Sequence, residues 1–218
     1  ETQEALERQT ATADILKVIA SSPSDVQPVF EAIAGSAKRL IGGFSTAVYR
    51  FIDGIAHLAA FTPTNQAADQ ILKNMYPRPT SDIPQFELAR TSGNAWQIPD
   101  VEEATEPDVK KVARTRGWRS ALGAPLVSNG VTIGLITVTR TQPGAYSDHH
   151  VQLLQTFADQ AVIAIENTRL FNETQEALER QTATADILKV IASSPDDVQP
   201  VFEAIAERAN RIVDGRST

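Results

Sequence analysis

The histidines are the first side chains to test for chemistry, because imidazole transfers protons, binds metals and accepts phosphate near neutral pH. The chain has three, at His57, His149 and His150. An acceptor histidine of the kinase type is followed directly by an acidic residue, whereas His150 is followed by Val151 and Gln152. We therefore interpret the pair as a solvated first helical turn. His57 lies in a strand-like run and is either a structural residue or a ligand contact.

Other catalytic constellations are missing from the sequence. There is no cysteine, which excludes thiol nucleophiles, thiolate metal sites and cofactors attached through sulfur. No cluster of Asp, Glu and His has metal-ligand spacing, and no glycine-rich phosphate loop or Ser/His/Asp arrangement is visible. We predict no catalytic residue, no metal site and no enzymatic activity for this chain, and we assign no cofactor.

A short basic cluster formed by Arg114, Arg116 and Arg119 surrounds Trp118. Such clusters bind nucleic acid when the overall field is positive, but the formal net charge here is −7. We interpret the three arginines as a solvated face and predict that the chain does not bind nucleic acid.

A proline-rich, irregular stretch between residues 62 and 106 is the place where a binding site is expected, because loops carry function more often than regular elements do. The only two tryptophans are Trp96, near the end of this stretch, and Trp118, shortly after it, and aromatic residues serve either as core or as ligand contacts. Position alone gives the ligand-pocket candidates, which are Tyr76, Arg78, Phe86, Trp96, Asp100, Trp118, Ser120 and His57.

An internal repeat organises the rest of the chain. Residues 1–34 recur as residues 173–206, and the two copies differ only at Ser24 and Asp196. The spacing of 172 residues is the size of a domain with its linker, so we expect a longer parent protein with tandem units. In the first copy, Leu6, Ala13 and Ala20 are spaced by seven, which favours helix pairing.

Hydrophobic periodicity and turn residues predict the remaining elements. Asp53-Gly54 and Asn129-Gly130 are strong hairpin signals. The second of these turns, with Pro125, divides an uncharged stretch at 120–139 that would otherwise resemble a membrane span. Helices are expected at 2–21, 26–41, 65–75, 85–92, 108–116 and 147–192, and strands at 44–52, 55–61, 120–127 and 131–139.

The second half of the sequence resembles GAF domains. The resemblance rests on the strand Ala124-Pro125-Leu126, the hairpin glycines Gly130 and Gly134, and the helix that begins at Leu153-Leu154 and continues to Ile165-Glu166-Asn167. The first half of the chain resembles the family more loosely, and the resemblance as a whole covers about residues 25–170. The flanking repeats resemble the helical linkers of bacterial histidine kinases that carry several GAF units.

The resemblance implies an α+β fold, GAF-like and related to PAS domains, with a central antiparallel sheet. It implies helices on one face, a ligand-sized cavity under loops on the other, and long flanking signalling helices. We expect a linker helix at 1–22, the GAF domain at 23–170, the second linker copy at 171–194 and a truncated helix of the next unit at 195–218. Cyclic-nucleotide-binding members carry Asn-Lys and Asp-Glu pairs, and both are missing here.

These observations predict a sensory module of a bacterial two-component histidine kinase, cytoplasmic and without a membrane segment, that couples a small-molecule pocket to paired helices. The alternatives are a ligand-free dimerisation spacer and, more remotely, an enzyme or a cyclic-nucleotide-binding domain. We expect a homodimer through the long helices. We also expect the truncated helix, with Val198, Val201 and Phe202 on its apolar stripe, to pack against another chain.

Overall fold

A computed structural model describes residues 2–104 and 106–193, together with residues 199 and 202. The chain divides into two compact units, residues 1–168 and residues 169–218, and each is described by itself. The helices are α1 (Thr2–Ser21), α2 (Gln27–Ile41), α3 (Gln66–Asn74), α4 (Pro84–Ser92), α5 (Pro107–Arg116) and α6 (Asp148–Ser193). The strands are β1 (Ser45–Ile52), β2 (Ile55–Phe61), β3 (Arg78–Pro79), β4 (Trp96–Ile98), β5 (Ser120–Ser128) and β6 (Val131–Arg140).

The strands form one antiparallel sheet in the order β3-β2-β1-β6-β5-β4. Both predicted hairpins are present, and their turns use left-handed backbone: φ is 51° at Asp53 and 76° at Gly54, and 51° at Asn129 and 79° at Gly130. Two consecutive positive φ values give a turn whose twist matches that of the strands. The β1–β2 and β5–β6 pairs are therefore set by local sequence.

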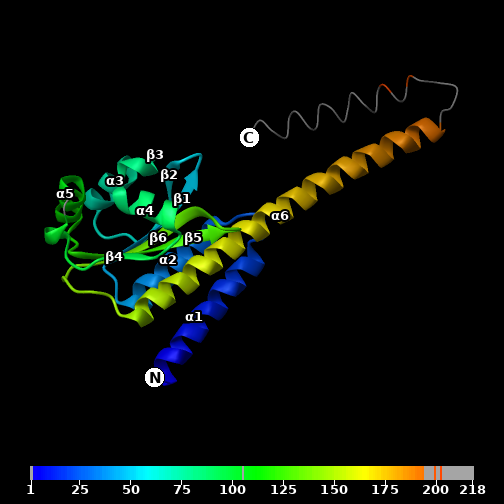
Figure 1. Cartoon of the computed structure of the whole chain (residues 1–218). Helices are drawn as coiled ribbons and strands as arrows, with labels where there is room; N and C mark the ends of the chain where they lie inside the picture. The colour runs from blue at the N-terminus through cyan, green and yellow to red at the C-terminus, as the bar shows by residue number, and fades with distance from the viewer. Residues whose placement is uncertain (1, 105, 194–198, 200–201, 203–218) are drawn as a thin grey trace. The chain divides into compact units, whose positions relative to one another are not determined.

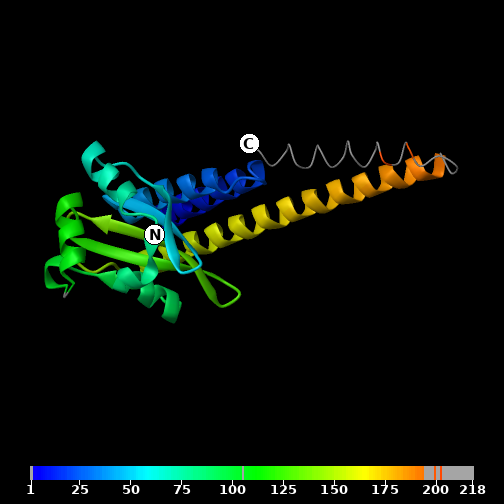
Figure 2. The same cartoon turned by 90° about the horizontal axis from the view of Figure 1, so that it is seen from above.

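Long and short helices lie on opposite faces of this sheet (Figure 1). Helices α1 and α2 and the first part of α6 bury their apolar residues against one face, where Phe30, Ile136 and Phe157 share a core. The short helices α3, α4 and α5 are set around the strands on the other face (Figure 2). The predicted α+β architecture is confirmed, with short helices among the loops of the second face.

Helix α2 ends as its sequence predicts. Gly42 caps it with φ of 66°, and the Gly43 N–H donates to the Lys38 carbonyl. Helix α1 buries Ala11 and Ile15 in the core instead of the heptad positions that favour pairing. Leu16, on the predicted pairing face, remains 47% exposed.

The irregular stretch is more regular than its sequence suggests. The prediction left residues 76–84 and 93–104 without strands, but β3 and β4 pair with the two ends of the sheet. Two- and three-residue strands are too short to show a hydrophobic period, so the pairing comes from the neighbouring strands β2 and β5.

Helix α6 contains the second repeat copy up to Ser193, the residue equivalent to the last residue of α1. Both copies are therefore helical over the same sequence. The prediction that the truncated helix packs on another chain concerns residues 195–218, and these lie outside the described residues apart from 199 and 202. Among the helices of the described part, none is long and apolar enough to cross a membrane.

Candidate ligand cavity

A cavity of about 470 Å³ lies on the face of the sheet that carries the short helices. Strands β1 and β6 form its floor through Ala47, Tyr49 and Thr137, while α3, α4 and α5 provide its walls. Small-molecule sites occupy roughly 300–1,000 Å³ and are mostly apolar with a few placed polar groups. The volume and lining of this cavity fall in that class.

Aromatic side chains form one side of the cavity. The ring of Tyr49 packs against both Tyr76 and Phe86, with ring centroids 4.9 and 4.8 Å away. Phe51 extends the cluster, 5.7 Å from Phe86. Helix α4 is held over the sheet because the Thr132 hydroxyl donates to the Ala89 carbonyl. The rings in these three contacts are tilted to one another by 36–59°, so the cluster forms an apolar wall with edges as well as faces exposed to the cavity.

Trp96 stands on the edge strand β4 and packs directly on the backbone of its partner strand. Gly123 lies opposite Trp96 in the β4–β5 pairing. A Cβ atom at position 123 would lie 2.4 Å from Cε2 of Trp96, so only glycine leaves room for the indole there. The buried indole Nε1 has no hydrogen-bond partner. Trp96 lines the cavity, but its Nε1 lies on the side of the ring that packs against Gly123.

The two cavity tyrosines remain neutral over the physiological range. Burial raises the pKa of Tyr49, an effect partly offset by hydrogen bonding with Tyr76 and by the charge of Arg116. Burial also raises the pKa of Tyr76, well above its usual value, and the neighbouring Tyr49 adds to the shift. Protonated hydroxyls can donate to an acceptor, so these groups favour electron-rich ligand atoms.

The structure corrects the interpretation of Arg116, the last residue of α5, as part of a solvated basic face. The basic cluster is not one solvated face: Arg114 pairs with Glu102 and Arg119 with Asp100, but Arg116 is only 6% exposed and lines the cavity. Its Nη1 has no hydrogen-bond partner. The missed signal is helical spacing, since Val109 and Val112 lie seven and four residues earlier and line the same cavity.

Five of the eight predicted pocket residues lie on the cavity wall, and three do not. The five are Tyr76, Arg78, Phe86, Trp96 and Trp118. The carboxylate of Asp100 accepts hydrogen bonds from the Arg119 guanidinium and from the Glu102 N–H, and so caps the turn that follows it. The Ser120 hydroxyl donates to the Gln142 carbonyl. His57 is half-buried on β2, opposite Arg50 in the β1–β2 strand pairing. Sequence reasoning missed Tyr49, Thr137 and Arg116.

The described residues offer little for metal or acid–base chemistry. No group of three or more His, Asp or Glu side chains among them could hold a metal ion. At the cavity rim, Arg78 and Asp82 form an ion pair with 3.6 Å between Nη2 and Oδ2. His150 contacts the Ser147 hydroxyl at 2.9 Å and Arg140 at 3.4 Å, and is only partly exposed. The arrangement suits binding.

The fold, with a ligand-sized cavity on one face and long helices on the other, defines a sensory type of domain. The GAF domain family model matches residues 25–165, and the chain belongs to this family. A comparison with curated protein sequences finds no match.

Solved structures agree on the fold. A GAF domain/HD domain protein from Geobacter sulfurreducens is 19% identical with a TM-score of 0.60, covering 69% of this chain and 97% of that one. A domain of a two-component sensor histidine kinase protein from Sinorhizobium meliloti 1021 is 16% identical with a TM-score of 0.57 and the same coverage. Free methionine-R-sulfoxide reductase from Neisseria meningitidis is 22% identical with a TM-score of 0.59, covering 77% and 93%. At these identities the likeness concerns the fold.

Proposed function

We propose that this chain is a sensory module of a bacterial two-component signalling protein, in which a small molecule in the cavity changes the packing of the long helices. The domain bounds that go with this proposal are residues 23–170 for the sensor and 1–22 and 171–194 for the linkers. The neighbour from a sensor histidine kinase protein supports the two-component assignment by likeness of fold. A cytoplasmic location accompanies it, as a chain without cysteine suits a reducing compartment.

The observation that carries the proposal is the alternation of side chains along the central strands. On β6, Thr137 lines the cavity while Ile136 and Val138 belong to the core beneath α2 and α6. On β1, Tyr49 and Val48 divide in the same way. Any movement of these strands on ligand binding reaches both sides, because a close-packed core transmits displacement.

Two polar contacts extend this connection to α6. Gln155 donates to the Pro125 carbonyl at 3.3 Å, and the Ser128 hydroxyl donates to the carboxylate of Glu166. Both partners on the sheet belong to β5, the strand that pairs with β4 beside the cavity. These contacts give α6 a register on the sheet that a ligand can bias.

The output of the module would be the pairing of helices in a homodimer. Leu16 on α1 and its repeat equivalent Leu188 on α6 are 47% and 59% exposed, so the same apolar position is open in both copies. Ile163, Leu170 and Leu178 are exposed on α6 as well. A second copy of this chain is the partner that places equal stripes in contact. Nucleic acid is not expected as a partner at a net charge of −7.

A thermal-shift screen of small metabolites, nucleotides, haem and metal ions tests ligand sensing. A ligand present at 100 times its Kd stabilises the folded protein by about 2.7 kcal/mol. The second half of the test uses the absence of cysteine: Leu178→Cys supplies a single crosslinking site on α6. A hit that also changes the rate of disulfide crosslinking supports coupling, whereas a hit without such a change contradicts it.

A ligand-free dimerisation spacer is the second candidate, favoured by the exposed apolar positions of α6. It predicts crosslinking at Leu178→Cys that no compound alters and a flat response across the screen. The sensor is overturned by that pair of results.

A further inference from the structure

One charged group in the cavity, Arg116, forms no ion pair with any residue that the structure describes. We propose that the cavity binds a small organic carboxylate with an apolar body, and that Arg116 holds its carboxylate group. This inference rests on the proposed ligand-sensing function and names the chemical class of the ligand.

The first argument is the state of the Arg116 side chain. It is 6% exposed, its Nη1 is buried without a hydrogen-bond partner, and no ion pair between described residues includes it. A buried charge without a partner is strongly unfavourable, and buried charges in proteins are normally paired. An anionic ligand in the adjacent cavity would complete this pairing.

The neighbouring arginines, unlike Arg116, each have a carboxylate partner within the protein. Arg114, two residues earlier on α5, donates to Glu102, and Arg119 donates from Nε to Asp100 at 3.0 Å. The other arginine of the cavity lining, Arg78, pairs with Asp82. Arg116 differs from all three, although it is the most buried residue of the basic cluster.

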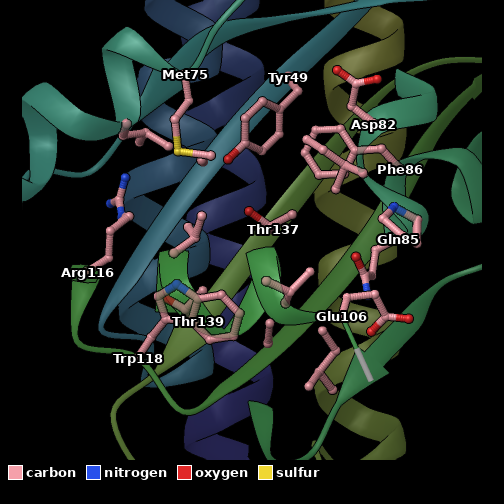
Figure 3. A pocket seen from close by; sticks show the side chains of 18 of the residues that line it. Tyr49, Met75, Asp82, Gln85, Phe86, Glu106, Arg116, Trp118, Thr137 and Thr139 are labelled. Carbon is pink, nitrogen blue, oxygen red and sulfur yellow. The ribbon is translucent and has the colours of Figure 1, made fainter. Parts of the chain in front are cut away.

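The groups around Arg116 complement an anion with a flat apolar body. Figure 3 shows Arg116 on the same side of the cavity as Trp118 and Met75, with the hydroxyl end of Tyr49 directed toward that side. Tyr49 and Tyr76 line the same cavity as Arg116, and its charge lowers the pKa of both, against the larger effect of burial. Neutral tyrosines are donors to an anion, and the aromatic rings can cover the rest of the ligand.

A carboxylate fits this environment better than a phosphate does. A guanidinium group binds a carboxylate through two parallel hydrogen bonds, which satisfies one charge with one charge. A phosphate dianion would need a second cation, but Arg78 is already paired, and Asp82 and Glu106 also line the cavity. Figure 3 shows Gln85 and Glu106 on the side of the cavity away from Arg116. The apolar part of the ligand would therefore fill the space between Arg116 and this polar pair.

Binding is tested by titration calorimetry on the 218-residue chain with matched compounds. The probes are benzoate, phenylacetate and 3-phenylpropionate, their uncharged amides, phenyl phosphate and acetate. At least one aromatic carboxylate should bind about 10- to 100-fold more tightly than its amide, the range expected for hydrogen bonds to a charged group. Arg116→Gln should abolish this difference and leave amide binding within about twofold, whereas Arg114→Gln, the control on the same helix, should preserve it.

The outcomes separate the two levels of the proposal. Equal affinity for acids and amides, or tighter binding of phenyl phosphate, overturns the carboxylate assignment while ligand sensing survives. Binding of none of the acids, when the broad metabolite screen still gives a hit, overturns this inference alone. A flat response in both experiments overturns it together with the sensory function.

A readout without ligand distinguishes a binding residue from a structural one. Arg116→Met keeps an apolar stem of similar length and removes the unpaired charge. The melting temperature of the ligand-free protein should then rise by a few degrees, about what relief of a buried unsatisfied group gives. A fall in melting temperature, with the far-ultraviolet spectrum unchanged, would mean that Arg116 stabilises the fold, and would overturn the proposal.

Discussion

The hydroxyl of Ser128, at the end of β5, donates a hydrogen bond to the carboxylate of Glu166 on α6. The two residues are 38 positions apart in sequence, and the bond links the tip of the β5–β6 hairpin to the helix that continues into the second repeat copy. It lies at the far end of the strand whose other end borders the cavity through Ala121.

Removal of the Ser128–Glu166 bond should loosen α6 on the sheet. Hydrogen bonds to charged groups contribute about 1.5–3 kcal/mol, and partial exposure here lowers the expectation to about 1 kcal/mol for Ser128→Ala. Urea denaturation of the two single variants and the double variant with Glu166→Gln measures the interaction. A coupling energy near zero would show that solvent replaces this bond without loss.

The packing of Trp96 on Gly123 gives a second prediction. Gly123→Ala places a methyl group where the indole now lies, and overpacking of this kind destabilises by about 1–3 kcal/mol. Gly35→Ala is the matched control, because a Cβ atom there meets nothing within 4 Å on helix α2. That control should stabilise the protein by about 0.5–1 kcal/mol through helix propensity.

Fluorescence distinguishes displacement of Trp96 from general loosening. In a Trp118→Phe background, Trp96 is the remaining tryptophan of the chain. Gly123→Ala should shift its emission to longer wavelength as the indole leaves its place, while Gly35→Ala leaves the spectrum unchanged. An unshifted spectrum in both variants would contradict the tight packing of Trp96 on β5.

Much of this fold could be predicted because its signals are local. Asp53-Gly54, Asn129-Gly130 and Gly42 fix turns and a helix end through backbone conformations that few other residues adopt. Strands β3 and β4 could not be predicted, since two or three residues show no period and their pairing depends on distant partners.

The site was less accessible to sequence reasoning. Position in the irregular stretch was enough to find Tyr76, Phe86 and Trp96 on the cavity wall. Arg116 was misinterpreted because a run of arginines usually faces water, and only its helical spacing from Val112 indicates the buried side. Tyr49 was missed because β1 shows no polar alternation: both its faces are covered.

The tyrosines make alkaline stability measurable. Burial raises the pKa of all three, Tyr49, Tyr76 and Tyr146. The folded protein thus holds these protons more tightly than the unfolded chain, whose tyrosines have a pKa of about 10. The resulting stability is complete below that pH and is lost as the pH rises through the folded values.

The expected titration curve is steep. As the pH is raised, the absorbance of tyrosinate should appear later in the folded protein than in the guanidinium-unfolded chain. It should then rise together with the loss of helical circular dichroism. Tyr76→Phe removes the strongest shift and should move alkaline unfolding to higher pH. Independent ionisation of a tyrosine near pH 10, in protein that remains folded, would contradict its burial.

The last prediction concerns the exposed leucines of the repeat. Leu178 and Leu188 lie on α6, 54% and 59% exposed, and exposed apolar side chains at helical spacing favour pairing with another helix. We expect a dimer at about 100 µM in sedimentation equilibrium, a concentration at which even weak specific interfaces are populated. Leu178→Lys with Leu188→Lys should convert it to a monomer with little effect on the unfolding of the sensor domain, because neither side chain belongs to its core. Glu176→Gln with Glu179→Gln is the control for charge, since it changes the net charge of the same stretch of helix by the same amount and leaves the leucines intact. If both pairs of substitutions dissociate the dimer equally, electrostatic repulsion and not the leucine stripe governs association. A wild-type chain that is monomeric at about 100 µM would rule out pairing through α6.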